Sequence, residues 1–226
     1  MTDPLSSCAI LLPAYRAGDS LRPLLTDLTL IISPDRIAVV NDGSPDNTDQ
    51  VIRDAGVHLV QHETNRGKGA ALRTGIEWWL ARSDWKVVVT MDADGQHAPG
   101  DISALVAVWR RSDVDIVIGK RNFADPGMPL ERRLSNSITS ALVSWKTGQT
   151  VEDSQCGFRL LSRRVVERVR WIADGYEAET EMLFRAASLG FRIAAAPIRT
   201  IYAGERSSMT RWTTTKAFVR TLLRNY

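Results

Sequence analysis

The sequence predicts an α/β fold in which helices flank a mostly parallel sheet. Short β-branched runs alternate with helical patterns through the first half of the chain. The runs at 37–40 (IAVV) and 87–90 (VVVT) are continuously apolar, which is typical of parallel strands buried on both faces. The chain has 226 residues, of which 44% are hydrophobic, so it is long enough to form a substantial core.

The first half supplies most of the expected sheet. Each expected strand is a short β-branched run, and each expected helix has apolar residues three or four positions apart. Prolines mark two helix starts, because Pro45 precedes one helix and Pro99 stands in the first turn of another. The expected strands are 9–12, 36–40, 57–61, 86–91 and 115–119, and the expected helices are 20–32, 47–55, 68–81 and 99–111.

The regular alternation ends after Gly119. Residues 122–131 are polar and contain proline and glycine, so a loop is expected there, followed by an amphipathic helix. No internal repeat, low-complexity tract or linker is visible, so we expect a single domain over 1–226. The remaining expected elements are helices at 132–146, 164–171, 179–189 and 216–224, a strand at 158–162, and one or two strands within 191–201.

Several protein classes are excluded by composition. No run of about 18 apolar residues occurs, so no helix is expected to span a bilayer. The amino terminus lacks the basic start and the long apolar stretch of a signal peptide. Two cysteines are too few for a disulfide framework. We therefore expect a cytoplasmic protein with reduced thiols.

The charge is divided unevenly along the chain. Residues 1–109 hold 9 Lys+Arg and 14 Asp+Glu, a net charge of −5, whereas residues 110–226 hold 20 and 12, a net charge of +8. One interpretation is an acidic half that holds a cation and a basic half that holds phosphates. The other is arginine-rich composition on solvated helix faces. The aromatic residues are not interleaved with basic ones, so nucleic acid is not expected as a partner.

Polar, turn-forming residues follow three of the expected strands, at 13–16, 41–44 and 92–97. In open α/β sheets ligands bind beyond the carboxyl ends of the strands. One rim of the sheet should therefore carry the acidic side chains of Asp42, Asp92 and Asp94. The chain has neither a GxGxxG sequence after the first strand nor a complete P-loop, so a nucleotide site of another kind is expected.

Asp92 and Asp94 form the strongest single signal. Two carboxylates at positions i and i+2 after a buried strand can both reach one hard cation such as Mg²⁺ or Mn²⁺. The alternative is an ordinary aspartate-rich turn. The predicted topology favours the cation site, because the pair lies where such sheets bind ligands.

Five segments occur in an order that identifies a family resemblance, and these are VVNDGSPDNT, NRGKGAALRTGI, VTMDADGQHAP, DSQCGFRLL and YEAETEMLFRAASLGFRI. The chain resembles family 2 glycosyltransferases, and among them the polyprenyl-phosphate sugar synthases, which include the dolichyl-phosphate mannose synthases. The likeness extends from about Cys8 to Ser208. It implies a GT-A fold with a Rossmann-like, mostly parallel sheet, a nucleotide-sugar donor and transfer with inversion.

The resemblance implies a donor site within about residues 1–121 and an acceptor side within about 122–226. Asp92 and Asp94 match a pair that contacts metal and ribose, and Gln96 matches a third ligand of Mg²⁺ or Mn²⁺. Such an ion stabilises the charge that develops on the leaving nucleoside diphosphate. At Asn41 the family often has aspartate, so this chain departs from the pattern there. The residues expected at the nucleotide sugar are Pro13, Ala14, Tyr15, Asp42, Lys68 and Asp92.

The acceptor side is expected to combine arginines with a candidate base. Arg121 matches a basic residue near the phosphates, and Asp153 takes the position of the family's candidate base, with a turn cap as its alternative role. Arg132 and Arg133 are expected to neutralise an acceptor phosphate. Glu179 matches a recurrent glutamate, for which a structural or acceptor-positioning role is expected.

The favoured function is transfer of a hexose from UDP- or GDP-hexose to a polyprenyl phosphate. Peripheral contact with the cytoplasmic face of the membrane is expected through the helices 132–146 and 216–224, although the second helix also suits simple packing. One alternative acceptor is a sugar or lipid hydroxyl. Two further alternatives are a sugar-1-phosphate nucleotidyltransferase, which should have a glycine-rich basic loop in place of 13–16, and an inactive binding module, against which the retention of Asp92 and Asp94 argues.

Overall fold

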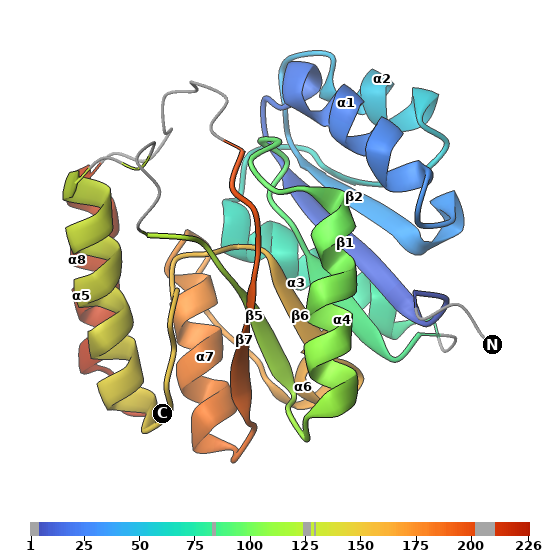
Figure 1. Ribbon diagram of the computed structural model, residues 1–226. Coiled ribbons are helices and arrows are strands. Elements are labelled where there is room, and N and C mark those ends of the chain that lie inside the picture. The colour runs from blue at the N-terminus through green and yellow to red at the C-terminus, as the bar shows by residue number, and fades with distance from the viewer. Residues whose placement is uncertain (1–4, 83–84, 124–127, 129, 202–210) are drawn as a thin grey trace.

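The computed structural model describes residues 5–82, 85–123, 128, 130–201 and 211–226. A seven-stranded sheet with the strand order β3-β2-β1-β4-β6-β5-β7 forms the centre of the molecule. Figure 1 shows helices on both faces of this sheet, with α4 in front and α3 behind. The predicted α/β class with a mostly parallel sheet is confirmed.

Most observed elements begin and end within a few residues of their expected positions. The helix expected at 164–171 ends earlier, at Arg168, and the region 191–201 forms one strand followed by an isolated bridge between Thr200 and His97. The strands are β1 Cys8–Ala14, β2 Ile37–Asp42, β3 His58–His62, β4 Val87–Thr90, β5 Ile116–Lys120, β6 Arg159–Ser162 and β7 Ile193–Pro197. The helices are α1 Gly18–Thr29, α2 Thr48–Asp54, α3 Lys68–Leu80, α4 Ile102–Arg111, α5 Leu130–Thr147, α6 Arg163–Arg168, α7 Ala178–Ser188 and α8 Arg211–Leu223, with short 3-10 turns at Pro34–Arg36 and Pro99–Asp101.

One strand runs against its neighbours. β1 pairs in parallel with β2 and β4, β2 with β3, and β5 with β7, whereas β6 is antiparallel to both β4 and β5. The alternation in the first half predicts only parallel pairing, and β6 departs from it after that alternation has ended. As a result, the segment that leads into β6 lies at the same rim as the carboxyl ends of β4 and β5.

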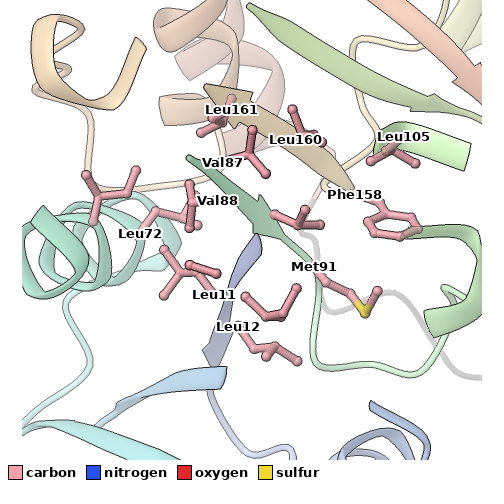
Figure 2. Packing of buried hydrophobic residues seen from close by; sticks show 14 of the residues in the cluster. Leu11, Leu12, Leu72, Val87, Val88, Met91, Leu105, Phe158, Leu160 and Leu161 are labelled. Carbon is pink, nitrogen blue, oxygen red and sulfur yellow. The ribbon is translucent and has the colours of Figure 1, made fainter. Parts of the chain in front are cut away.

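The core is built where the central strands meet α3 and α4. Figure 2 shows buried side chains of β1, β4 and β6 packed together, with Phe158 beside them. α3 approaches β1 so closely that a Cβ atom on Gly75 would clash with a methyl group of Leu11. The indole of Trp79 donates a hydrogen bond to the Ile10 carbonyl at 3.2 Å. This dense packing gives the rim a rigid base.

α5 and α8 lie side by side and pack on α7, away from β1 to β3 (Figure 1). Lys146 near the end of α5 donates hydrogen bonds at 2.6 Å to the carbonyls of Leu222 and Arg224, at the end of α8. A cation at this position complements the carboxyl end of a helix. Within the described part of the chain, no helix has the length and apolar character needed to cross a membrane.

Candidate active site

Asp92 lies just beyond β4, against the loop that leads into β6. A Cβ atom on Gly157 would lie 2.5 Å from Asp92 Oδ2, so only glycine fits beside this carboxylate. The Thr90 hydroxyl donates a hydrogen bond to the Gly157 carbonyl at 3.0 Å, and this bond holds Gly157 next to Asp92. The antiparallel pairing of β4 and β6 thus brings a residue of the second half of the chain against the predicted metal ligand.

Lys68, the first residue of α3, is held between two carboxylates. Its Nζ lies 2.6 Å from Asp92 Oδ1 and 2.7 Å from Glu179 Oε2, and the side chains of Lys68 and Glu179 are only 14% and 9% exposed. Burial alone would lower the pKa of Lys68, but the two carboxylates raise it above its usual value. Burial also opposes the charge on Asp92, but Lys68 lowers the pKa of that carboxyl below its usual value. Lys68 and Asp92 are therefore both charged at neutral pH.

Asp94 faces an unfavourable electrostatic environment. Burial and the neighbouring charge of Asp92 both raise the pKa of the Asp94 carboxyl above its usual value. One of its oxygens accepts a hydrogen bond from the Gln96 amide at 3.0 Å. A cation beside Asp94 would relieve the repulsion between the two carboxylates.

His97 completes the loop after β4. Its ring packs 5.3 Å from the Phe158 ring, and burial lowers its pKa, so the imidazole is neutral at physiological pH. Nδ1 of His97 is buried and has no hydrogen-bond partner among the described residues. The signal in the sequence was the position of His97 directly after the predicted metal ligand Gln96.

The residues present fit a hard divalent cation. Carboxylate and amide oxygens of Asp92, Asp94 and Gln96 are the donor types that Mg²⁺ and Mn²⁺ prefer. The described residues contain no cluster of three His, Cys, Asp or Glu side chains that could enclose an ion. Two carboxylates with open remaining positions suit an ion that keeps water and phosphate oxygens.

Asp42 lies at the same rim, but both oxygens of its carboxylate already bind other groups of the protein. It accepts hydrogen bonds from the backbone amides of Arg66 and Gly67, at 2.9 and 2.8 Å, and contacts His62 Nδ1 at 2.6 Å. Asp42 therefore fixes the turn that precedes Lys68. The neighbouring Asn41 is buried, donates a hydrogen bond to Gln61 Oε1 and accepts one from the Ser44 amide.

Backbone amides at the amino terminus of α3 are also bound by another part of the protein. The Asp174 carbonyl accepts hydrogen bonds from the amides of Gly69 and Ala70, at 2.6 and 3.3 Å. A Cβ atom on Gly67, whose φ is 95°, would clash with the same carbonyl oxygen. Gly67 and Gly69 thus allow α3 to pack closely on the segment before α7, and this packing places Lys68.

The end of β1 presents Tyr15 to solvent. Pro13 is partly buried and Ala14 fully buried, whereas Tyr15 is exposed with the Arg16 guanidinium 5.4 Å from its ring centre. The Arg16 amide donates a hydrogen bond to the Ser44 hydroxyl at 3.0 Å, so the loops after β1 and β2 are joined. An exposed aromatic ring at this rim is available for stacking on a base.

Arg121 and Asp153 form a buried pair beyond β5. Arg121 Nε and Nη2 donate to the two oxygens of Asp153 at 2.7 and 2.8 Å, and the Asp153 side chain is 0% exposed. Burial opposes the charge on Arg121, but the bond to Asp153 raises the pKa of the guanidinium. The pair is a rigid bidentate clamp, and Asp153 has no access to solvent.

Arg159, at the start of β6, supports the site from within the fold, and the sequence analysis did not single it out. Its fully buried guanidinium donates to the carbonyls of Ser154, Cys156 and Glu179, each at 2.8 Å. It therefore joins the loop under Asp92 to the first turn of α7, where Glu179 holds Lys68. An arginine directly before two leucines in a short strand was the available signal.

The remaining predicted residues lie on α5 and α7. The side chain of Arg132 is outside the described part, and that of Arg133 is partly buried. Glu181 is buried and accepts hydrogen bonds from the Ile172 and Ala173 amides and from Arg185, whereas Glu179 faces Lys68. Glu181 therefore stabilises the segment before α7.

The sequence is similar to that of known glycosyltransferases. The family model for glycosyl transferase family 2 matches residues 9–170. The chain is 30% identical to a polyprenol monophosphomannose synthase of Mycolicibacterium smegmatis over 86% of this chain and 77% of that protein. It is 31% identical to an undecaprenyl-phosphate mannosyltransferase of Micrococcus luteus over 83% and 81%.

The fold has a close structural counterpart. Glucosyl-3-phosphoglycerate synthase from Mycobacterium tuberculosis, solved with Mn²⁺, UDP and phosphoglyceric acid, superposes with a TM-score of 0.74 over 96% of this chain and 78% of that one, at 19% identity. Fold and rim together define a glycosyltransferase of the GT-A class. The chain belongs to glycosyl transferase family 2, and it resembles the polyprenyl-phosphate sugar synthases within that family.

Proposed function

We propose that this enzyme transfers a hexose from a nucleoside diphosphate sugar to a polyprenyl phosphate, in one displacement that inverts the anomeric carbon. The observation that carries the proposal is the rim beyond β4, where Asp92 and Asp94 lie beside Lys68. Anionic and cationic groups held together there suit a cation and a diphosphate bound as one unit. The relatives described as polyprenol and undecaprenyl-phosphate mannosyltransferases support the acceptor class.

In this proposal, Asp92, Asp94 and Gln96 would hold Mg²⁺ or Mn²⁺. When bound, the ion neutralises the charge that develops on the leaving diphosphate. Lys68 supplies a further positive charge next to Asp92, and Tyr15 offers a ring for the base of UDP or GDP. Pro13, Ala14 and Asp42 shape the floor of this donor site, Asp42 through the turn before Lys68.

A phosphate acceptor agrees with the state of Asp153. A phosphate monoester near neutrality is already deprotonated, so its oxygen can attack without a general base. Both oxygens of the buried Asp153 accept bonds from Arg121, which leaves the carboxylate poorly placed to take a proton from a hydroxyl. In the proposal Asp153 positions Arg121 near the phosphates, and Arg132 and Arg133 on α5 anchor the acceptor phosphate. A sugar or lipid hydroxyl acceptor is the alternative.

The outer face of α5 supports contact with a lipid surface. Leu134, Ile138, Leu142 and Trp145 are exposed along one side of the helix, with Trp145 78% exposed. On the neighbouring α8, Phe218 and Leu222 pack inward while Val219 and Leu223 remain exposed. An apolar stripe with basic residues beside it suits a helix lying at an anionic membrane surface. We propose that this face brings the site to its lipid acceptor on the cytoplasmic side.

The test has a binding arm and a transfer arm. Thermal shifts are measured with UDP, GDP and their hexoses, each with Mg²⁺, Mn²⁺ or EDTA, because a ligand that binds the native state raises the melting temperature. Transfer of labelled hexose to a short polyprenyl phosphate is then compared with transfer to the matching polyprenol. We expect cation-dependent transfer to the polyprenyl phosphate and none to the polyprenol. Transfer to the polyprenol only would contradict the proposed acceptor.

A further inference from the structure

Lys68 occupies the place where a cation would compensate Asp92. Its ammonium lies 2.6 Å from Asp92 Oδ1 and forms an ion pair with it. A divalent ion on the same carboxylate would repel this ammonium at short range. The ion can bind well only if another partner holds Lys68.

Glu179 is that other partner. Its Oε2 lies 2.7 Å from the same Nζ, and the side chain is nearly buried, so the bond is weakly screened. Glu179 comes from α7, whereas Asp92 follows β4, so the two carboxylates reach Lys68 from different parts of the fold. A shift of the ammonium toward Glu179 would free Asp92 without leaving a buried charge unpaired.

Glu179 itself is held in place by the protein. Its carbonyl accepts a hydrogen bond at 2.8 Å from Arg159, and Arg159 Nε lies 3.8 Å from its second carboxylate oxygen. Arg159 is completely buried and also binds the loop that lies against Asp92. The two carboxylates that share Lys68 therefore lie against the same rigid support, whereas the ammonium is carried by a long side chain with four rotatable bonds.

We propose that Glu179 is a positioning residue that takes up Lys68 when a divalent cation binds Asp92, and so sets the cation affinity of the site. The inference rests on the proposed cation site. In the cation-free protein Lys68 pairs with Asp92 and thereby reduces, without abolishing, the repulsion between Asp92 and Asp94. In the loaded protein Lys68 remains on Glu179, beside the position proposed for the diphosphate.

The test measures Mn²⁺ binding to the purified protein without nucleotide, by electron paramagnetic resonance of the free ion. Glu179→Gln should weaken Mn²⁺ binding by about fivefold or more. The reason is that Asp92 is then the only one of the two observed carboxylate partners left to Lys68. Lys68→Met should tighten Mn²⁺ binding, because the competing ammonium is gone. The matched control is Glu177→Gln. It removes a neighbouring negative charge that forms no observed ion pair with Lys68, so the Mn²⁺ affinity should be unchanged.

The double variant Lys68→Met, Glu179→Gln separates this role from a folding defect. If Glu179 acts through Lys68, the double variant should bind Mn²⁺ as tightly as Lys68→Met alone, whereas general damage from Glu179→Gln would persist. Unchanged Mn²⁺ affinity in Glu179→Gln, or no recovery in the double variant, overturns the inference and leaves the proposed function standing. Absence of Mn²⁺ binding by the unaltered protein overturns the cation site, and this inference with it.

Discussion

Gly157 and Asp92 are in such close contact that a Cβ atom on the glycine would lie 2.5 Å from Asp92 Oδ2 and 2.8 Å from Oδ1. The contact joins the loop before β6 to the end of β4. A methyl group at this position must displace either the carboxylate or the backbone beneath it, and the core behind both leaves little room for adjustment.

Gly157→Ala should therefore destabilise the fold by about 1–3 kcal/mol, the usual cost of overpacking, and should abolish cation-dependent donor binding. Thermal melts with and without Mn²⁺ and UDP measure both effects. Gly100→Ala is the control, because its Cβ would meet only the end of the flexible Arg199 side chain at 3.2 Å. Normal donor binding in Gly157→Ala would show that Asp92 need not keep its observed position.

Asp94→Asn should stabilise the cation-free protein while removing its response to Mn²⁺. The pKa of Asp94 is raised, so its protonated form is favoured in the fold, and that contribution to stability is lost as the pH rises through the folded-state pKa. At neutral pH Asp94 is ionised beside Asp92, and the neutral amide relieves this repulsion. We expect a rise in melting temperature of about 2 °C at pH 7.5, which disappears near pH 3.

The same Asp94→Asn variant should show no further rise in melting temperature when Mn²⁺ is added. The amide oxygen can still accept the bond from the Gln96 amide, so the loop geometry is preserved. A variant that is less stable than the unaltered protein at pH 7.5 would mean that Asp94 is already compensated by a positive group.

Cys156 should be unreactive in the native protein. Burial, with the nearby Asp153 charge, raises the pKa of its thiol to about 12, so almost no thiolate exists at pH 8. Cys8 is buried as well. A disulfide-exchange reagent at pH 8 should titrate no thiol in the native state and both in urea. Rapid reaction of one thiol without denaturant would contradict the packing around Gly157 and Phe158.

The proposed acceptor site can be tested by enzyme kinetics. Arg133→Ala should raise the apparent KM for polyprenyl phosphate several-fold and leave the donor KM unchanged, and Arg132→Ala should act in the same direction, since each removes an anchor for an anion. Arg110→Ala, which removes an exposed charge on α4, is the control. If both α5 variants leave the acceptor KM unchanged, the phosphate binds elsewhere.

The variant Asp153→Asn gives a second test of the proposed phosphate acceptor. With a phosphate acceptor, Asp153→Asn should retain appreciable turnover, after correction for the folded fraction, because the new amide oxygen would still accept one bond from Arg121. Loss of a required base would lower kcat by about 10²–10⁴-fold in fully folded protein. That outcome, combined with harmless arginine changes, would indicate a hydroxyl acceptor.

The apolar face of α5 predicts binding to anionic vesicles. Leu134→Gln combined with Ile138→Gln should reduce co-sedimentation with vesicles that contain phosphatidylglycerol, at both low and high salt, because the apolar contact is not screened by ions. Leu30→Gln is the control, because Leu30 is 79% exposed at the end of α1, far from α5 (Figure 1). If the unaltered protein fails to sediment at either salt concentration, the membrane-contact proposal is wrong.

Local patterns in the sequence predicted those parts of the fold that depend on them. The apolar runs of β2 and β4 and the prolines before α2 and α4 located the parallel half within a few residues. The direction of β6 could not be predicted, because the four residues Arg159–Ser162 carry no sign of their partners. That direction depends on long-range pairing with β4 and β5.

The candidate site was predicted unevenly for the same reason. Asp92 and Asp94 are neighbours in sequence, so their proximity could be inferred from spacing alone. The contacts of Lys68 with Glu179 and of Asp42 with the turn at Arg66 join residues far apart along the chain, and only the folded structure reveals them. The fully buried Arg159 depends on carbonyl groups whose positions are set by the same tertiary packing.

The reversed direction of β6 also has a consequence for synthesis of the protein on the ribosome. β4 needs β6 as its neighbour on one side, yet about seventy residues separate them. Until β6 leaves the exit tunnel, the apolar strand Val87–Thr90 presents an open edge that can pair with other chains. Premature termination before residue 159 should thus yield an aggregating fragment rather than an independent nucleotide-binding module.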